Sequence, residues 1–66
     1  MKMIQVKSDA INAIGYDQDS MKMRIEFQQG NIYDFCRVPE QVYKSFISAA
    51  SIGGYYNDYI KDKYPC

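Results

Sequence analysis

Hydrophobic and charged residues alternate strictly over residues 21–27 (MKMRIEF). This period of two predicts a β-strand with one buried face. Another apolar segment, INAIGY (11–16), predicts the strand before it, and the polar sequence DQDS (17–20) predicts the turn between them. Near the N-terminus, MIQV (3–6) is consistent with either a short strand or an extended arm.

The next strand is predicted over residues 31–38 (NIYDFCRV), directly after the sequence QQG (28–30). A three-residue loop over QQG would put Gly30 in the left-handed conformation of a bulged hairpin. The alternative is a two-residue turn at Gly30 and Asn31. It shifts the strand pairing by an odd number of residues and so turns every side chain to the other face.

These two registers turn Tyr33 and Phe35 to opposite faces of the sheet. The three-residue loop places Ile25 opposite Tyr33 and Met23 opposite Phe35, so that apolar residues meet. The shorter turn would place both aromatic residues on the charged face. The hydrophobic pattern favours the first register, which makes both rings part of the core. A stacking platform for nucleic-acid bases is the alternative role for the two rings.

Two helices are predicted after the strands. Pro39 suits a first helical position, where its missing N–H is not needed. The stretch 39–50 (PEQVYKSFISAA) has the apolar spacing of an amphipathic helix. The sequence SIGG (51–54) predicts the end of that helix and a junction at which Ser51 caps the next one. The second helix is predicted over residues 55–64.

Together these elements predict an α+β fold, in which a three-stranded antiparallel meander is followed by two helices packed on one sheet face. A chain of 66 residues corresponds to one domain, residues 1–66. The predicted core consists of the apolar positions that face the junction of sheet and helices: Met23, Ile25, Phe27, Tyr33, Phe35, Val42, Phe46, Tyr56 and Ile60.

Composition narrows the classes of function. The chain has eight basic and eight acidic residues, and this balance counts against strong non-specific binding of nucleic acid, because phosphate neutralisation dominates such binding. Its apolar runs are too short to span a membrane, and its charged N-terminus does not resemble a signal peptide. We therefore expect a cytoplasmic protein without a membrane partner.

No catalytic, metal or cofactor site is predicted. The chain has no histidine and only two cysteines, Cys36 and Cys66, too few ligands for a structural zinc site. In a reducing cytoplasm we expect no disulfide, with Cys36 structural and Cys66 a free terminal thiol. No sequence neighbour activates a nucleophile or forms an acid–base pair, so an enzyme is not predicted.

The ordered combination of motifs resembles the KTSC domain family, named for its occurrence at the C-terminus of some lysyl-tRNA synthetases. The resemblance runs from about Val6 to Tyr64. Its motifs are IxAIGYD (11–17), Gly30, Val38-Pro39, Val42-Tyr43, SxGxYYN (51–57) and the aromatic pair of the central strand. The family's YxY reads Tyr33-Asp34-Phe35 here, so one hydroxyl is missing. The resemblance implies an RNA-binding role, suggested by attachment to a tRNA-charging enzyme.

Two hypotheses of function follow. The first is weak binding of RNA or single-stranded nucleic acid by tyrosine stacking and phosphate contacts, through Arg37, Lys44, Tyr55, Tyr59, Lys61 and Lys63. Arg37 has a second interpretation, an ion pair with an acidic side chain. The second hypothesis is protein–protein interaction or homo-oligomerisation, in a bacterial or phage protein, because tyrosine-rich surfaces suit interfaces.

Overall fold

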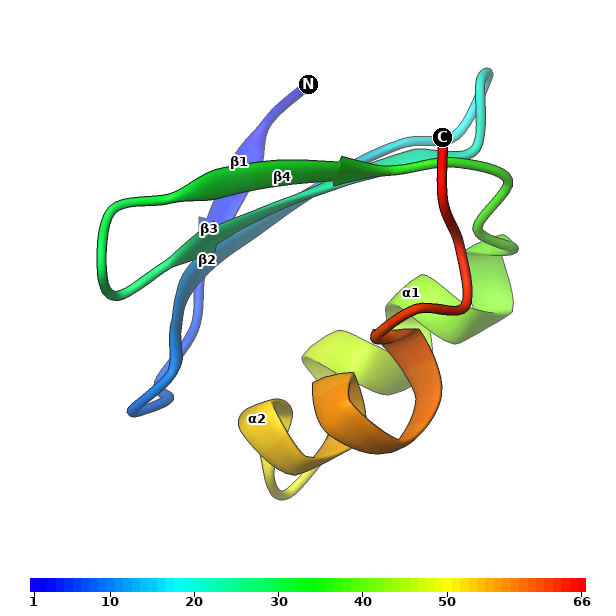
Figure 1. Ribbon diagram of the computed structural model, residues 1–66. Coiled ribbons are helices and arrows are strands. Elements are labelled where there is room, and N and C mark those ends of the chain that lie inside the picture. Colours follow the sequence, from blue (N-terminus) through cyan, green and yellow to red (C-terminus); the bar gives the residue numbers. More distant parts are fainter.

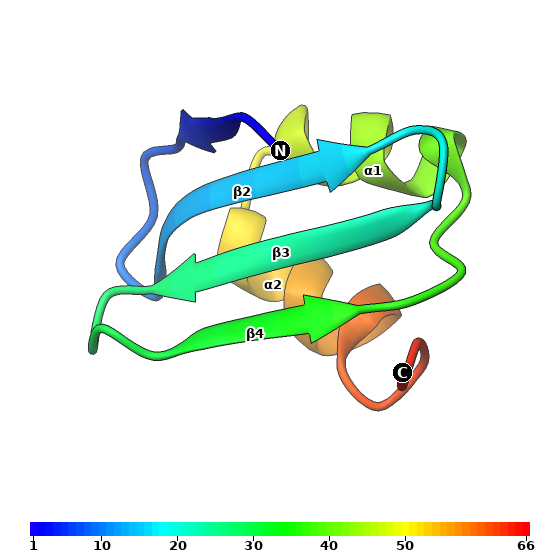
Figure 2. The ribbon, with the colours of Figure 1, turned by 90° about the horizontal axis from the view of Figure 1, so that it is seen from above.

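An antiparallel sheet forms one layer of the molecule, and the helical segments cover one of its faces (Figure 1). The computed structural model describes residues 1–66. The strands follow one another in sequence order across the sheet (Figure 2). They are β1 (Met3–Gln5), β2 (Ile11–Asp17), β3 (Lys22–Phe27) and β4 (Ile32–Phe35). The helical segments are α1 (Glu40–Ile47), α2 (Ile52–Tyr55) and the π-helical turn η1 (Tyr56–Ile60).

The α+β class is confirmed, but the predicted meander lacked a strand. The segment Met3–Gln5 pairs with β2 as the strand β1, with Met3 opposite Gly15. Gly15 makes room for this strand's side chain, because a Cβ atom at that position would lie 2.5 Å from the sulfur of Met3. The N-terminal segment therefore belongs to a sheet of four strands rather than three.

The predicted register of the β3–β4 hairpin is confirmed. Ile25 lies opposite Tyr33, and Met23 lies opposite Phe35. The three-residue loop closes with a hydrogen bond of 2.8 Å from the Phe27 N–H to the Asn31 carbonyl. Gly30 has a φ of 99°, which a residue with a side chain rarely adopts.

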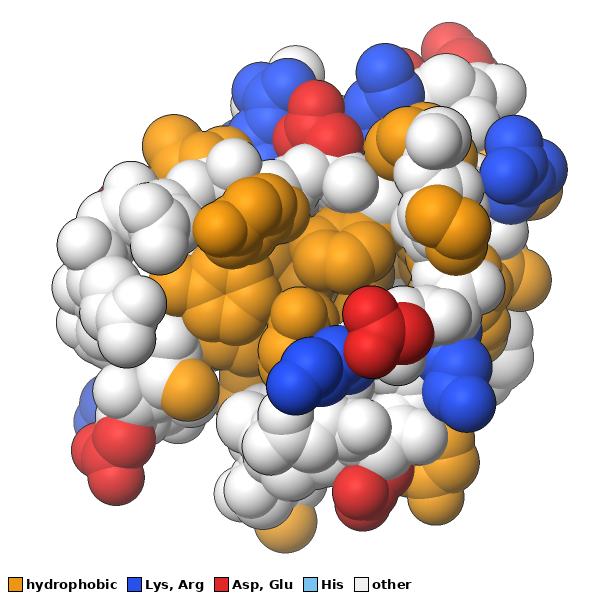
Figure 3. Space-filling view, viewed as in Figure 1, with side chains coloured by type: hydrophobic (Ala, Val, Ile, Leu, Met, Phe, Trp, Pro, Cys, Tyr) orange, Lys and Arg blue, Asp and Glu red, His pale blue; other side chains and the backbone are white.

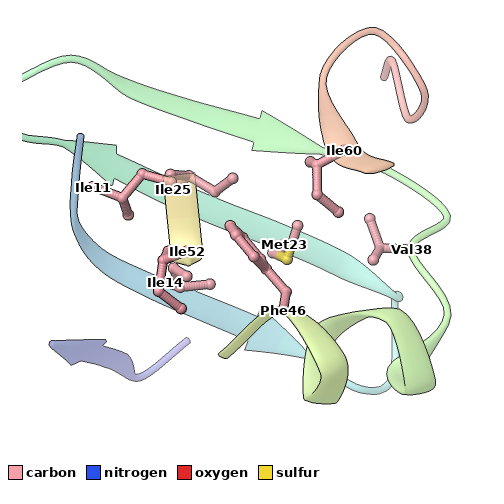
Figure 4. Packing of buried hydrophobic residues seen from close by; sticks show 8 residues of the cluster. All are labelled: Ile11, Ile14, Met23, Ile25, Val38, Phe46, Ile52 and Ile60. Carbon is pink, nitrogen blue, oxygen red and sulfur yellow. The ribbon is translucent and has the colours of Figure 1, made fainter. Parts of the chain in front are cut away.

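The centre of the core lies between β2, β3 and the helices. A bulge at Asn12 shifts the pairing of β2 with β3 and so turns both Ile11 and Ile14 toward the helices. Figure 4 shows their side chains beside those of the other strands and helices. The buried cluster comprises Ile11, Ile14, Met23, Ile25, Val38, Phe46, Ile52 and Ile60.

The predicted core is correct at its centre and wrong at its edge. Met23, Ile25, Phe46 and Ile60 are buried, whereas Tyr33 is 54% exposed. Tyr33 lies on the predicted face, but β4 is the last strand of the sheet and the helices do not cover its ring. Partial burial is found at Phe27, Phe35, Val42 and Tyr56.

The helix α1 is held against the sheet near its first turn. Tyr16 of β2 donates a hydrogen bond of 2.6 Å to the Val38 carbonyl, and its ring stacks on Tyr43 of α1 at 4.6 Å. Burial raises the pKa of Tyr16, and the carboxylates of Glu40 and Asp17 raise it further. The hydroxyl is thus kept as a neutral donor at the junction of sheet and helix.

The predicted boundaries of the helices require correction. Gly53 and Gly54 were expected in a break, but they lie inside α2, so the second helical segment begins at Ile52 and not at residue 55. The predicted cap is confirmed, since the Ser51 hydroxyl accepts a hydrogen bond of 3.1 Å from the Gly54 N–H. This hydroxyl supplies a partner for a free N–H at the helix start, which stabilises a helix despite its glycines.

The prediction for the cysteines is wrong. Cys36, one residue beyond β4, forms a disulfide with Cys66 at the C-terminus. The two Cα atoms are 4.8 Å apart although 30 residues separate them in sequence. The expectation of free thiols came from an assumed reducing compartment, and the folded chain instead brings the C-terminal segment back beside β4.

Candidate ligand-binding groove

A groove of about 240 Å³ runs beside β4. Residues of β4, η1 and the C-terminal segment line it: Tyr33, Asp34, Phe35, Tyr56, Asp62, Tyr64 and Pro65. We call this the aromatic groove. Figure 3 shows hydrophobic side chains gathered in a hollow below β4, with acidic and basic side chains at its lower rim.

The rings that line the aromatic groove are in edge contact with one another or with Phe27, which lies behind them and does not line the groove. Tyr56 lies 5.2 Å from Phe27 and 6.2 Å from Phe35, measured between ring centroids. Phe27 is also 5.7 Å from Tyr33. These edge-to-face contacts are the arrangement that aromatic pairs prefer, and they hold the rings in place without covering Tyr33.

The C-terminal wall of the groove is fastened to the end of β4 in several ways. The Cys36 N–H donates a hydrogen bond of 3.1 Å to the Tyr64 carbonyl. The Arg37 guanidinium donates one of 3.2 Å to the Pro65 carbonyl. With the disulfide, these bonds place Tyr64 and Pro65 opposite the strand.

Two acidic residues line the aromatic groove, and they differ in where their carboxylates lie. The side chain of Asp34 points to the other sheet face from Tyr33 and Phe35. Asp34 accepts hydrogen bonds of 2.7 and 3.1 Å from Arg24, and these bonds lower the pKa of its carboxyl. Asp62 takes part in neither of the two ion pairs of the chain. Its charge adds to the effect of burial in raising the pKa of Tyr56. The groove therefore carries one unpaired negative charge and no lining cation.

The open edge of β4 runs along the same groove. Phe27 and Asn31 form a hydrogen-bonded pair that closes the hairpin. From Asn31 onward, every second residue of β4 therefore directs its N–H and C=O toward β3, and the residues between them direct theirs away from it. The N–H and C=O groups of Ile32 and Asp34 consequently point away from β3. The Asp34 carbonyl lies 3.5 Å from the sulfur of Cys66. The groups left open on this last strand of the sheet are the N–H and C=O of Ile32 and the N–H of Asp34, and another extended chain could pair with them.

The residues predicted to contact nucleic acid are only partly brought together. Tyr55 and Tyr59 are in contact, with ring centroids 4.6 Å apart. Tyr59 is 58% exposed, whereas Tyr55 is half-buried and stacks on Phe46. Tyr55 is therefore a packing residue as much as a surface residue, and Tyr59 is the free ring of the pair.

The predicted cations are distributed over several elements. Lys44 on α1 makes an ion pair of 3.7 Å with Glu40. Arg37 was expected to meet a carboxylate or a phosphate, but its partner is a backbone carbonyl. Lys61 and Lys63 are exposed in the segment after η1, and they follow Tyr59 closely in the sequence.

Sequence reasoning missed the half of the groove that the C-terminal segment provides. Asp62 has a φ of 62°, so the chain turns sharply there and directs Tyr64 and Pro65 toward β4. The two cysteines were the available signal, because a link between them would bring these distant segments together. The assumption of reduced thiols removed that signal.

Comparison with known proteins places this arrangement in a family. Residues 7–64 match the sequence model of the KTSC domain. The chain belongs to the KTSC domain family. A KTSC domain protein from Yersinia pestis, known from a crystal structure, has the same fold with a TM-score of 0.93 and 35% sequence identity. The match covers 96% of this chain and 89% of that one.

Relatives of this KTSC domain include short chains and a part of a longer enzyme. A protein of Tsukamurella paurometabola is 32% identical, over 94% of this chain and 92% of its own length. An uncharacterized protein of Stutzerimonas stutzeri is 28% identical, over 97% and 90%. A lysine–tRNA ligase of Nostoc punctiforme is 29% identical over 94% of this chain, which spans only 11% of that enzyme.

Proposed function

We propose that this KTSC domain is a non-enzymatic binding module that receives an extended segment of another protein in the aromatic groove. The observation that carries the proposal is the exposed ring of Tyr33 beside the open edge of β4. An extended segment adds main-chain hydrogen bonds at such an edge, and side-chain pockets supply the selectivity. No helix of the chain is long and apolar enough to cross a membrane.

The rings and the charge of the groove support a protein ligand over an RNA ligand at this position. Tyrosine offers a large apolar contact area together with a polar tip and is enriched where proteins bind one another. The unpaired carboxylate of Asp62 would repel a phosphate, whereas RNA binding relies on cations close to the backbone.

Two exposed tyrosines allow a matched test of this proposal. Random peptides selected on the wild-type protein are titrated into the variants Tyr33→Ala and Tyr59→Ala. Both residues have about the same exposure, 54% and 58%. Any general effect of losing a surface ring should therefore be the same in the two variants. We expect Tyr33→Ala to weaken binding at least about tenfold, a loss of about 1.4 kcal/mol, and Tyr59→Ala to leave it unchanged. Equal loss in both variants would contradict the proposal.

A second candidate function is binding of single-stranded RNA around Tyr59. Its exposed ring is followed by the exposed Lys61 and Lys63, and stacking combined with phosphate contacts is the usual basis of such binding. The presence of a similar segment in a lysine–tRNA ligase supports this candidate.

The same pair of variants tests the RNA candidate with the opposite expectation. A mixed-sequence RNA 12-mer is titrated into labelled protein at low and moderate salt, and amide shifts are followed by NMR. Binding around Tyr59 would be weakened by Tyr59→Ala and not by Tyr33→Ala. Shifts that vanish at moderate salt would indicate charge attraction without stacking. Unchanged spectra at low salt would remove this candidate.

A further inference from the structure

The aromatic groove has the composition of a cation site. Its lining includes Tyr33, Tyr56 and Tyr64 together with Phe35 and two acidic residues, and it includes no basic residue. Ring faces attract cations through their negative electrostatic potential. Because Asp34 is already bound to Arg24 by two hydrogen bonds, Asp62 is the carboxylate left for a ligand.

Asp62 is exposed to solvent and also lines the groove. Its φ of 62° belongs to the turn after η1, which closes with a hydrogen bond of 3.0 Å from the Lys63 N–H to the Ile60 carbonyl. The next residues are fastened to β4 by the disulfide and by the bond from Cys36 to the Tyr64 carbonyl. The carboxylate therefore belongs to a wall whose position the fold determines.

The size of the groove matches one side chain. Its volume of about 240 Å³ is below the range of about 300–1,000 Å³ that is usual for pockets of drug-sized molecules. Alternate side chains of an extended segment point to the same sheet face. A segment paired with β4 would thus direct one side chain to the face on which Tyr33 and Phe35 lie.

Resting on the proposed function, we propose that the side chain received by the aromatic groove is an arginine of the bound segment. The planar guanidinium stacks on the tyrosine rings, and its N–H groups donate to the Asp62 carboxylate. Arginine suits this site better than lysine because it combines stacking with a fixed fork of donors. A phosphate or a carboxylate of a ligand would meet repulsion at the same position.

The first experiment uses a small probe that needs no strand pairing. N-acetyl-arginine N-methylamide and its neutral citrulline analogue are titrated separately into labelled protein, and resonances of Tyr33 and Tyr56 are followed by NMR. We expect saturable shifts with the arginine amide at millimolar concentration and a response at least about tenfold weaker with the citrulline amide. Equal responses, or no response to either amide, would overturn the proposal.

The second experiment tests whether the carboxylate of Asp62 is the group that recognises the guanidinium. Asp62→Asn keeps a residue that tolerates the left-handed conformation, and Asp58→Asn is the matched control, since Asp58 is exposed on η1 and does not line the groove. We expect Asp62→Asn to abolish the preference for arginine over citrulline and Asp58→Asn to retain it. Retention of the preference in Asp62→Asn would overturn the assigned role of that carboxylate.

The third experiment separates failure of this inference from failure of the proposed function. An extended blocked peptide, Thr-Val-Arg-Val-Thr, and its citrulline version are titrated by the same method. Equal binding of both peptides would leave strand pairing intact and overturn the arginine site. Binding of the arginine amide without any added affinity of the peptide would leave the arginine site intact and contradict uptake of an extended segment.

Discussion

The same face of the sheet is a sealed core over β2 and β3 and an open groove along β4. Over the central strands, Ile14 and Ile25 are fully buried under Phe46 and Ile52 (Figure 4). Along β4, Tyr33 faces the same side but remains half-exposed. Apolar patterning thus defines a face of a sheet, while the length and position of the helices decide how much of that face becomes core.

The residue types in the two regions match this difference. The core region is mostly aliphatic, and its side chains have no polar atom that needs a partner. The groove region consists of aromatic rings, and its tyrosine hydroxyls can meet water or a ligand. We infer that the core maintains the fold and that the groove is the part available for binding.

The largest effect expected from this comparison is at Phe46. Phe46→Ala removes a completely buried ring from the centre of the core, and we expect it to lower the free energy of unfolding by about 3–5 kcal/mol, the cost typical of such truncations. Urea denaturation followed by circular dichroism measures this loss. In a domain of this size the variant could be largely unfolded, because small domains have little stability to spare.

Phe35→Ala is the counterpart in the groove region. Its ring is only partly buried, so we expect a loss on the order of 1–2 kcal/mol, in proportion to the smaller area removed from water. If both variants lost the same free energy, the groove region would be core in energetic terms and the contrast between the two regions would be wrong.

The next effect concerns the disulfide. Reduction of Cys36–Cys66 is expected to lower the free energy of unfolding by about 3.5 kcal/mol, because the link closes a loop of roughly 30 residues in the unfolded chain. Urea denaturation with and without a phosphine reductant measures this change. The double variant Cys36→Ser, Cys66→Ser should be insensitive to the reductant, and an equal response in it would exclude the disulfide as the cause.

Reduction of the disulfide should also affect the core and the groove to different extents. The buried cluster includes no residue of the C-terminal segment, although Tyr64 packs against it. Tyr64 and Pro65 form one wall of the groove. We expect amide hydrogen exchange to increase around the wall and less around Ile25. A cytoplasmic location stays a prediction, and in that compartment the reduced form would be the relevant one.

The sequence was informative where the pattern of side chains and the local backbone agree. The register of β3 and β4 followed from the alternation in residues 21–27 and from Gly30, because a slip would bury charges. The cap at Ser51 followed from a short local signal. The strand β1 was left undecided, because a segment of three paired residues carries little periodicity.

The sequence was misleading where distant segments meet. Tyr33 was assigned to the core because the alternation along the strand places it on the face that the helices cover. The alternation does not show where the helical layer ends. The aromatic groove depends on the turn at Asp62 and the link between Cys36 and Cys66, which no periodicity encodes. Of the predicted binding residues, Tyr55 belongs to α2 and lies against Phe46 of α1.

A smaller effect on stability is expected at Tyr33. Tyr33→Ala removes an exposed ring whose main contact is the edge of Phe27, so we expect a loss of about 1 kcal/mol or less. We expect this variant to lose much more free energy of peptide binding than free energy of unfolding. Peptide titration measures the first quantity and thermal denaturation the second, on the same sample. A loss of stability as large as that of Phe46→Ala would show that the ring belongs to the core.

The smallest effect concerns the ion pair on the outer face. Arg24 lowers the pKa of the Asp34 carboxyl through two hydrogen bonds and its charge. A lowered pKa in the folded state means that the pair contributes stability above the carboxyl's unfolded pKa of about 3.9. This contribution is lost as the pH falls through the lower, folded pKa. Because both side chains are partly exposed, we expect a small effect that salt weakens further.

Asp34→Asn isolates this contribution. The difference in free energy of unfolding between wild type and variant should be largest at neutral pH. It should shrink as the pH falls below the unfolded pKa of the carboxyl and through its lower, folded pKa. Urea denaturation over this range measures it. A difference that stays constant with pH would mean that Asp34 acts by shape and not by charge.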